Sequence, residues 1–366
     1  MAASQQRFTP AFCPNPDCKH HQNQEGWRFI RWGHYLRSCP RVHAVPRYRC
    51  SHCRRTFSRQ TFQTHYWLRR PELFHSICER LLSGSGLRQI TRFLHCSPTT
   101  VMTHAARLGR HALLILETYR PHRAPTEPVV IDGFEGFAFS QYYPLHLNLA
   151  VGAESHFVYA FSESELRRKG RMTTAQKRKR TREEALVGRP DPQAIERGMA
   201  EVVALVVPPG ERACIRSDDH RAYPRAFIRL KDRTLTHEVT SSKAARTPGN
   251  PLFPVNRQDA MLRHTGANHR RETIAFSKSR AGVIERAALQ WVFMNFMKSF
   301  SEKKRDATPA QRLGITHHLW TVQDFLRERL FASRVALPPV WRAYYERRIR
   351  TRRLPQSKLH QLRYAF

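Results

Sequence analysis

Four cysteines near the start of the chain are spaced as ligands for one metal ion. Cys13 and Cys18 form one pair, and Cys50 and Cys53 form a second pair after 31 intervening residues. Two thiolates on one tight turn supply two corners of the tetrahedron that zinc prefers, and a second turn completes it. The wide gap inside the first pair leaves other side chains as competing ligands, namely His20, His21, His34 and Cys39.

The segment that carries these cysteines has little apolar content. Residues 1–62 read as short strands separated by polar turns, which is the pattern of a zinc ribbon. The alternative is a set of four unligated thiols on loops. So short a segment would fold poorly without a metal, and we therefore predict one structural zinc ion.

Two aspartates in the middle of the chain come at the ends of apolar, strand-like runs. Asp132 closes VVID, and Asp218 closes CIRSD. A single Asp at a strand end commonly caps a turn. Two strands that end together place their next side chains beside each other, which is how a sheet assembles a site for a divalent cation. A third carboxylate would permit two ions, the arrangement that supports in-line phosphoryl displacement.

The third carboxylate has three candidates on the helical stretch after the last predicted strand, namely Asp259, Glu272 and Glu285. Asp259 is preferred because it lies in the first turns of a helix, where a side chain can be aimed at the strand ends. Asn256, one turn earlier, could orient it or a water molecule. Glu285 borders an apolar helix face, and Glu272 follows two arginines that offer surface partners.

These acids lie in a chain segment with an α/β pattern. After a linker at 121–128, the apolar periodicity predicts three strands, a helix, a strand, a helix, a strand and a helix. We therefore expect an α/β fold class with a mixed sheet flanked by helices over residues 121–300. A basic insertion near 163–190 interrupts this domain, and residues 301–366 are expected to form a basic helical extension.

The charge of the chain points to a polyanionic partner. The 366 residues include 63 Lys and Arg but only 29 Asp and Glu, a formal net charge of +34. Nucleic acid is the commonest polyanion that such a charge serves. There is no apolar run long enough for a membrane span and no apolar core of a signal peptide at the start. We expect a cytoplasmic, nucleoid-associated protein with no membrane partner.

Two segments are candidates for contact with DNA. Residues 72–120 predict a helix, a polar turn and a second helix capped by Ser97, which is typical of a helix-turn-helix, although a plain helical hairpin is the alternative. The basic insertion is either a floppy charged loop or an arm that contacts phosphates. The expected contact residues are Thr99, Thr100, His104 and Arg107 in the first segment and Arg178, Lys179 and Arg180 in the second.

Taken in order, these motifs resemble bacterial insertion-sequence transposases of the DDE type, which have an RNase H-like catalytic domain. The third motif departs from the family pattern, since Asn256 and Asp259 stand where a Glu is usual. The matching segments are CPNPDC and CSHC for the zinc ribbon, GLRQITRFLHCSPTTVMTHAARLG for the helix-turn-helix, VVIDGFEGF and IRSDDHRAYPRAF for the first two acids, and LFPVNRQDAMLRHTGANHRRETIAFSKS for the third.

The resemblance implies a mechanism and a set of partners. Mg²⁺ or Mn²⁺ held by Asp132, Asp218 and Asp259 would activate water to cut one DNA strand, and the freed 3′-hydroxyl would then attack target DNA. The ribbon and the helix-turn-helix would bind the element ends. The implied partners are double-stranded DNA, as element ends and as target, and further copies of the chain in a homo-oligomer. The alternative is a catalytically inactive, transposase-derived DNA-binding regulator.

Overall fold

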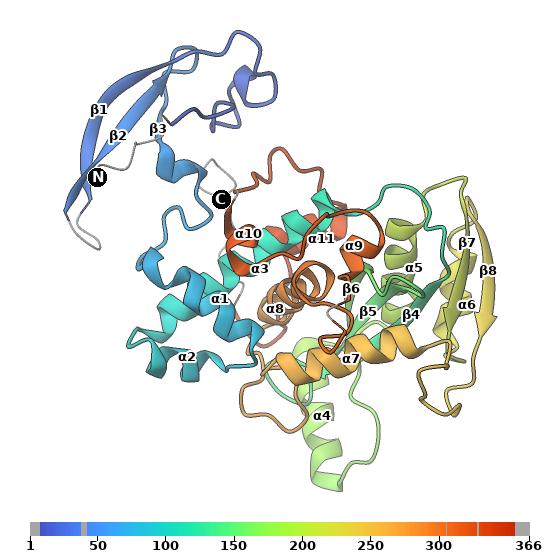
Figure 1. Cartoon of the computed structure of the whole chain (residues 1–366). Helices are drawn as coiled ribbons and strands as arrows, with labels where there is room; N and C mark the ends of the chain where they lie inside the picture. The colour runs from blue at the N-terminus through green and yellow to red at the C-terminus, as the bar shows by residue number, and fades with distance from the viewer. Residues whose placement is uncertain (1–7, 38–41, 305, 328, 356–366) are drawn as a thin grey trace.

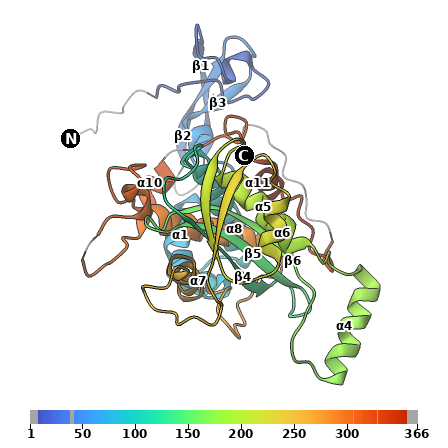
Figure 2. The same cartoon turned by 90° about the vertical axis from the view of Figure 1, so that its right-hand side faces the viewer.

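A computed structural model describes residues 8–37, 42–304, 306–327 and 329–355. Cys39, one of the competing zinc ligands, lies outside these residues. The N-terminal part forms a small antiparallel sheet of β1 (Phe29–Arg37), β2 (His43–Cys50) and β3 (Thr56–Ser58), flanked by the short turns η1 (Lys19–His21) and η2 (Arg59–Phe62). Figures 1 and 2 show this sheet projecting from the body of the molecule.

Three helices and a short turn follow: η3 (Pro71–Leu73), α1 (Phe74–Leu82), α2 (Leu87–Phe93) and α3 (Pro98–Thr118). The Ser97 hydroxyl accepts a hydrogen bond from the backbone N–H of Thr100 at 3.2 Å, so α3 begins at the cap expected from the sequence. Farther along, α3 crosses α8 (Arg280–Val292) so closely that a Cβ atom on Gly109 would lie 2.4 Å from Glu285. The helix α3 is therefore built into the main core.

The main body contains a five-stranded mixed sheet in the order β6-β5-β4-β7-β8. β4, β5 and β6 pair antiparallel, whereas β4, β7 and β8 pair parallel. This is the RNase H-like mixed sheet flanked by helices that was expected from the sequence, with one helix more than predicted between β6 and β7 and one more after β8. The strands are β4 (Val129–Phe137), β5 (Pro144–Gly152), β6 (Val158–Glu165), β7 (Arg212–Ser217) and β8 (Thr234–Val239).

Helices cover both faces of this sheet (Figure 1). α5 (Ala194–Val206) packs against β5 and β6 and contacts α6 (Ala222–Ile228). On this face the Ser162 hydroxyl donates to the carbonyl oxygen of Gly198 in α5 at 2.8 Å. α7 (Phe253–Thr265) packs against β4 and β5, and α8 follows it after residues 266–279. The sequence predicted a mostly helical run from 256 to 300 without this break.

The last part of the chain packs back onto the body. η4 (Phe293–Met297) leads to the short helices α9 (Pro309–Arg312), α10 (Val322–Arg327) and α11 (Pro339–Tyr345). The Trp341 indole donates to the carbonyl oxygen of Phe161 at 2.8 Å, and the Tyr344 hydroxyl accepts from the backbone N–H of Glu163 at 2.7 Å. The aromatic side chains of α11 therefore cover the edge strand β6.

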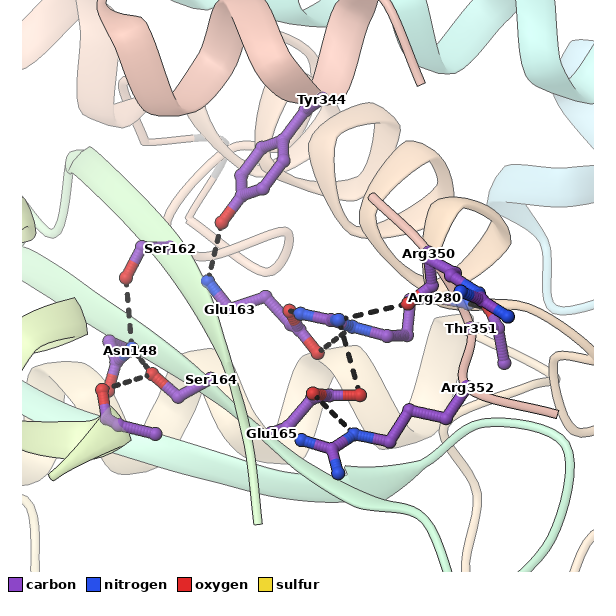
Figure 3. A network of polar contacts seen from close by, with 11 residues as sticks. Asn148, Ser162, Glu163, Ser164, Glu165, Arg280, Tyr344, Arg350, Thr351 and Arg352 are labelled. Carbon is purple, nitrogen blue, oxygen red and sulfur yellow. Dashed lines mark hydrogen bonds and ion pairs between the residues drawn. The ribbon is translucent and has the colours of Figure 1, made fainter. Parts of the chain in front are cut away.

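A partly buried ion-pair network ties β6 to the start of α8 and to the segment after α11 (Figure 3). The Arg280 guanidinium donates to Glu163 at 2.9 Å and lies 3.2 Å from Glu165. Arg352 donates to Glu165 at 3.0 Å. Both glutamates thus have arginine partners, which explains how these acids are accommodated at the edge of the sheet.

The basic insertion contains a helix rather than a loop. α4 (Thr174–Val187) begins with reciprocal hydrogen bonds between Thr173 and Gln176, and it stands off the body in Figure 2. Glu184 anchors it by accepting from Arg167 at 2.8 Å and from Arg189 at 3.0 Å. Across the residues that the structure describes, no helix combines the length and the apolarity needed to cross a membrane.

Candidate active site

Asp132 and Asp218 lie side by side on neighbouring parallel strands. In the pairing of β4 with β7, Val129 stands opposite Ile215 and Val130 opposite Arg216. Two residues further along, the same register brings Asp132 level with Asp218, with the strands about 4.8 Å apart. The sequence predicted that both acids end their strands. Asp218 directly follows β7, but β4 continues to Phe137 because it pairs with β5 along its whole length.

The side chain of Asp132 points to the α7 side of the sheet. Its neighbour Gly133 pairs with Asn148, whose amide donates to Ser162 on the side covered by α5. Successive side chains alternate between the faces of a strand, so Asp132 and Phe134 face the other way. Phe134 confirms this orientation, because the Arg263 guanidinium of α7 lies 4.3 Å from its ring.

Asp259 approaches the same place from α7. Its Oδ1 atom is buried, and no hydrogen-bond donor among the described residues reaches it. Burial, together with repulsion from the charge of Asp132, raises the pKa of Asp259 to about 7. Burial and the charge of Asp218 likewise raise the pKa of Asp132, against the lowering effect of hydrogen bonds from Gly133 and Tyr223. Burial and mutual repulsion therefore dominate the electrostatics of the two carboxylates, and nearby positive charge compensates them only in part.

Tyr223 of α6 forms a hydrogen bond with Asp132 and is affected by the charges of all three aspartates. Its buried hydroxyl donates to Oδ1 of Asp132 at 3.1 Å. Burial raises the pKa of Tyr223, and the negative charges of Asp132, Asp218 and Asp259 raise it further. The phenol is thus held in its protonated, donating form. Sequence reasoning missed this residue, although its position five residues after Asp218 in DDHRAY was visible.

Positive charge reaches the site from two elements. Arg263 lies one helical turn after Asp259 on α7, and the two charges interact. Arg246, on the exposed segment between β8 and α7, acts on both Asp132 and Asp259 by lowering their pKa values. Asp219, in contrast, contacts the segment between β8 and α7. Its carboxylate accepts a hydrogen bond from the backbone N–H of Ser242 at 3.5 Å.

The two alternative third acids lie elsewhere. Glu285 is buried and paired with Arg347 at 2.8 Å and with Arg110 at 3.7 Å. Glu272 is exposed in the segment between α7 and α8. Of the three candidates, Asp259 is the one on which the charge of Asp132 acts.

The four predicted zinc ligands come together in the N-terminal sheet. The Sγ atoms of Cys13, Cys18, Cys50 and Cys53 all lie within 4.8 Å of one another, and within the described ranges no other group of three or more potential ligands is as compact. This cluster could hold a zinc ion. Burial raises the pKa of Cys50, but N–H donors on the backbone of Cys53 and on the Trp27 indole outweigh it and bring the value to about 7.

The competing histidine His21 is committed to other contacts. Its Nδ1 lies 2.7 Å from the carbonyl oxygen of Cys13, and its Nε2 lies 2.7 Å from the Ser333 hydroxyl. His21 therefore joins the zinc-ribbon segment to the C-terminal part of the chain. The three aspartates, in contrast, are not drawn as close together as the cysteines, as expected for carboxylates that repel one another.

Two of the expected DNA contacts in α3 do not face outward. His104 is buried, with Nε2 at 2.8 Å from the carbonyl oxygen of Arg69. Arg107 is buried and donates to the carbonyl oxygens of Thr64 and Tyr66 at 3.0 Å. Both residues hold the loop before α1 against α3, so we correct their assignment to structural positions. Thr99 is exposed, and Thr100 is partly exposed with its hydroxyl 3.1 Å from that of Ser97.

The three basic candidates on α4 differ in their surroundings. Arg178 is exposed to solvent. Lys179 is exposed and lies 5.1 Å from the ring of Tyr142. Arg180 donates to the carbonyl oxygen of Arg168 at 3.0 Å and lies 3.6 Å from Glu184, so part of its role is to anchor the helix.

Comparison with known proteins finds similarity among solved structures but none among family models or curated sequences. No family model matches the chain, and no curated protein matches its sequence. One similar solved structure is a chain of the simian T-cell lymphotropic virus intasome in complex with the PP2A regulatory subunit B56 gamma. The two chains share 13% identity over 68% of this chain and 74% of that chain, with a TM-score of 0.24.

Proposed function

We propose that this protein is a DNA transposase of a bacterial-type insertion sequence that cuts and transfers DNA strands with the help of divalent metal ions. The observation that carries the proposal is the group of three aspartates around Tyr223 in an RNase H-like sheet. Asp132 and Asp218 are level on adjacent strands, and Asp259 faces them from α7. In a chain of net charge +34, a buried aspartate that is repelled by one further aspartate and itself repels another is a costly arrangement unless the group binds a cation.

The residues fit a divalent ion. Asp259 has a buried Oδ1 atom without a donor among the described residues, and the pKa values of Asp132 and Asp259 are raised by burial and by their neighbours' charges. Carboxylate oxygens are the ligands that Mg²⁺ and Mn²⁺ prefer. We assign Asp132, Asp218 and Asp259 as the residues that would hold the metal. When bound, such ions lower the pKa of a coordinated water and stabilise the leaving oxygen in phosphoryl displacement.

The surrounding residues position the acids and attract the substrate. Tyr223 and the backbone N–H of Gly133 both donate to Oδ1 of Asp132, at 3.1 and 2.7 Å, and so fix the rotation of this carboxylate. Arg246 and Arg263 bring positive charge next to the acids, where the phosphates of a DNA strand would lie. Lys and Arg on α4, together with the zinc-ribbon segment, extend the cationic surface for the duplex.

The proposal includes the partners of the reaction. The substrates are double-stranded DNA carrying the element ends and double-stranded target DNA. Because two ends must be joined to one target, we propose that the working form is a homo-oligomer assembled on DNA, acting at the nucleoid.

The proposed function is tested by cleavage of duplex DNA that carries the inverted repeats flanking the gene. With Mg²⁺ or Mn²⁺, the wild-type protein should nick these ends and join them to target DNA. Asp132→Asn, Asp218→Asn and Asp259→Asn should each abolish both steps and keep duplex affinity. Asp219→Asn is the matched control, since Asp219 lies next in the chain but supports the segment after β8.

Three results would decide against parts of this proposal. Cleavage retained in Asp218→Asn and lost in Asp219→Asn would reverse the choice between neighbours. Wild-type rates in Asp259→Asn would remove Asp259 from the site. A wild-type protein that binds the ends tightly but never cuts them would instead be a transposase-derived DNA-binding regulator.

A further inference from the structure

A large groove separates the first helices from the segment after α7. It has a volume of about 1120 Å³. One wall is formed by α2 and the first turns of α3, and the opposite wall by residues 267–279, which we call the 267–279 segment. Figure 1 shows these two parts of the chain on the same side of the body, below α3.

The groove is strongly cationic. Arg88 and Arg92 of α2 face Arg270 and Lys278 of the 267–279 segment, and all four side chains are exposed. Glu285 is the single acidic residue among those that line it. That carboxylate is already neutralised by Arg110 and Arg347, so the charge open to a ligand is positive. The groove therefore suits a polyanion.

The groove also exposes apolar groups, which a phosphate surface alone would not need. Met102 of α3 is 56% exposed, and Ile274 is 97% exposed. The ring of Phe276 is partly exposed and carries the Lys278 ammonium 3.7 Å from its centre. Apolar and aromatic side chains beside cations are the combination that binds unpaired bases, which stack while their phosphates pair with Lys and Arg.

The shape of this surface argues against a duplex as its occupant. A recognition helix reads a duplex by projecting into the major groove, about 12 Å wide. Here the exposed residues at the start of α3, Thr99, Met102 and Thr103, form a wall of a concave groove with the 267–279 segment opposite. A concave surface of this kind suits a strand that lies within it, whereas reading a duplex requires an element that projects outward.

One wall of the groove contacts β4, the strand that carries Asp132. The Phe276 ring packs on Phe137, the last residue of β4, with ring centres 5.2 Å apart. The backbone N–H of Phe139 donates to the carbonyl oxygen of Ser277 at 2.8 Å. Asp132 lies five positions before Phe137 on the same strand, roughly 17 Å away at the usual rise per residue.

We infer that this groove binds an unpaired stretch of DNA strand, at a distance from the acid group that a few nucleotides can span. The inference rests on the proposed function for its substrate, DNA, and adds that part of the strand leaves the duplex and lies between α2–α3 and the 267–279 segment. It assigns a nucleic-acid contact to Arg92, Ile274, Phe276 and Lys278.

The test measures binding without metal. The probe is a fluorescein-labelled single strand of roughly 12 nucleotides, within the usual site size of such grooves, and its duplex is the comparison. Both are titrated with the full-length protein in EDTA and followed by anisotropy. Ile274→Glu should weaken single-strand binding about tenfold, because it removes an apolar contact with the bases and adds a negative charge that repels the phosphates. Ile274 is 97% exposed, so this change leaves folding intact.

The matched control is Ile228→Glu on α6. It is the same substitution at a side chain that is 67% exposed and lies outside the groove. It should bind both probes like wild type. In the double variant Arg92→Ala/Lys278→Ala, the slope of log affinity against log salt concentration for single-strand binding should fall by about 0.7 for each lost phosphate contact.

Several outcomes would overturn the inference. These are wild-type single-strand affinity in Ile274→Glu, an equal loss for single strand and duplex, or no single-strand binding by the wild-type protein. This binding measurement does not depend on the proposed DNA cleavage. Asp218→Asn should bind the single strand like wild type even where it no longer cuts DNA, so failure of the groove and failure of the acid group are separate findings.

Discussion

The hydroxyl of Tyr223 donates to Oδ1 of Asp132 across the space between α6 and β4, at 3.1 Å. The backbone N–H of Gly133 donates to the same oxygen at 2.7 Å. Oδ1 accepts both hydrogen bonds, and together they fix the rotation of the Asp132 carboxylate. Tyr223 is thus a positioning residue for the acid at the centre of the group.

Tyr223→Phe should weaken the use of Mg²⁺ without changing DNA affinity. The variant keeps the buried ring and loses one hydrogen bond to a carboxylate, which costs about 1.5–3 kcal/mol. We expect the Mg²⁺ concentration for half-maximal cleavage to rise roughly tenfold. Tyr35→Phe is the control, because its hydroxyl bonds within the N-terminal sheet to Ser58 and Gln60. An unchanged Mg²⁺ requirement in Tyr223→Phe would remove Tyr223 from this role.

Asp259→Asn should make the metal-free protein more stable at alkaline pH. The pKa of Asp259 is about 7 in the folded chain and about 3.9 when unfolded, so folding takes up a proton between these values. Since the folded state then binds more protons than the unfolded state, the free energy of unfolding falls as pH rises through this window. Wild type should therefore melt at a lower temperature at pH 8 than at pH 5.

Differential scanning calorimetry in EDTA checks this dependence. At pH 8 the melting temperature of Asp259→Asn should exceed that of wild type by roughly 2–4 °C for each kcal/mol gained in the free energy of unfolding. Mg²⁺ should raise the melting temperature of wild type more than that of the variant. Asp219→Asn should keep the wild-type fall with pH, since Asp219 is exposed and apart from the acid group. A variant that melts with wild type at pH 8 would contradict the raised pKa.

The sequence predicted the sheet and its acids because both leave local signals. Apolar runs mark the strands, and Asp132 and Asp218 follow such runs. Tyr223 left no comparable signal, because its partner lies 91 residues earlier and is brought near only by the pairing of β4 with β7. Contacts between residues far apart in the chain depend on the register of the strands, which periodicity does not specify.

The wrong DNA contacts in α3 have a similar cause. His104 and Arg107 are polar residues on a helix, and periodicity places polar residues on the solvent side. Both are buried because backbone carbonyls of residues 64–69 accept their hydrogen bonds. For α4 a signal was present: Thr173 followed three residues later by Gln176 is a helix-start pattern in the basic insertion.

Arg178→Gln should weaken binding of every duplex by a similar factor. Arg178 is exposed on α4, and a phosphate contact carries no sequence information. The slope of log affinity against log salt should fall by about 0.9. Arg180→Gln should act differently, because Arg180 also holds α4 through Arg168 and Glu184. Increased proteolysis of residues 170–190 would report that loosening. A loss restricted to one duplex sequence in Arg178→Gln would mean that α4 reads bases.

Cys50→Ser should abolish zinc binding and unfold the N-terminal sheet while the body stays folded. The small core of this part consists of Cys13, Cys18, Cys50 and Phe57 with partly buried aromatic neighbours, so it contains little apolar surface apart from the metal site. The body has its own, far larger core around the mixed sheet and α3. Elemental analysis should find one zinc per wild-type chain and none in the variant.

Limited trypsin digestion shows which part is lost. The arginines of β1 and β2 should be cut rapidly in Cys50→Ser and in chelator-treated wild type, leaving a resistant fragment that contains the mixed sheet. Cys96→Ser is the control, since Cys96 lies outside the cluster and packs against the main core. A metal-free preparation that resists trypsin and binds duplex DNA like wild type would show that the four thiols fold without zinc. The close approach of the sulfur atoms, all within 4.8 Å, is the arrangement that four thiolates around one tetrahedral zinc ion require.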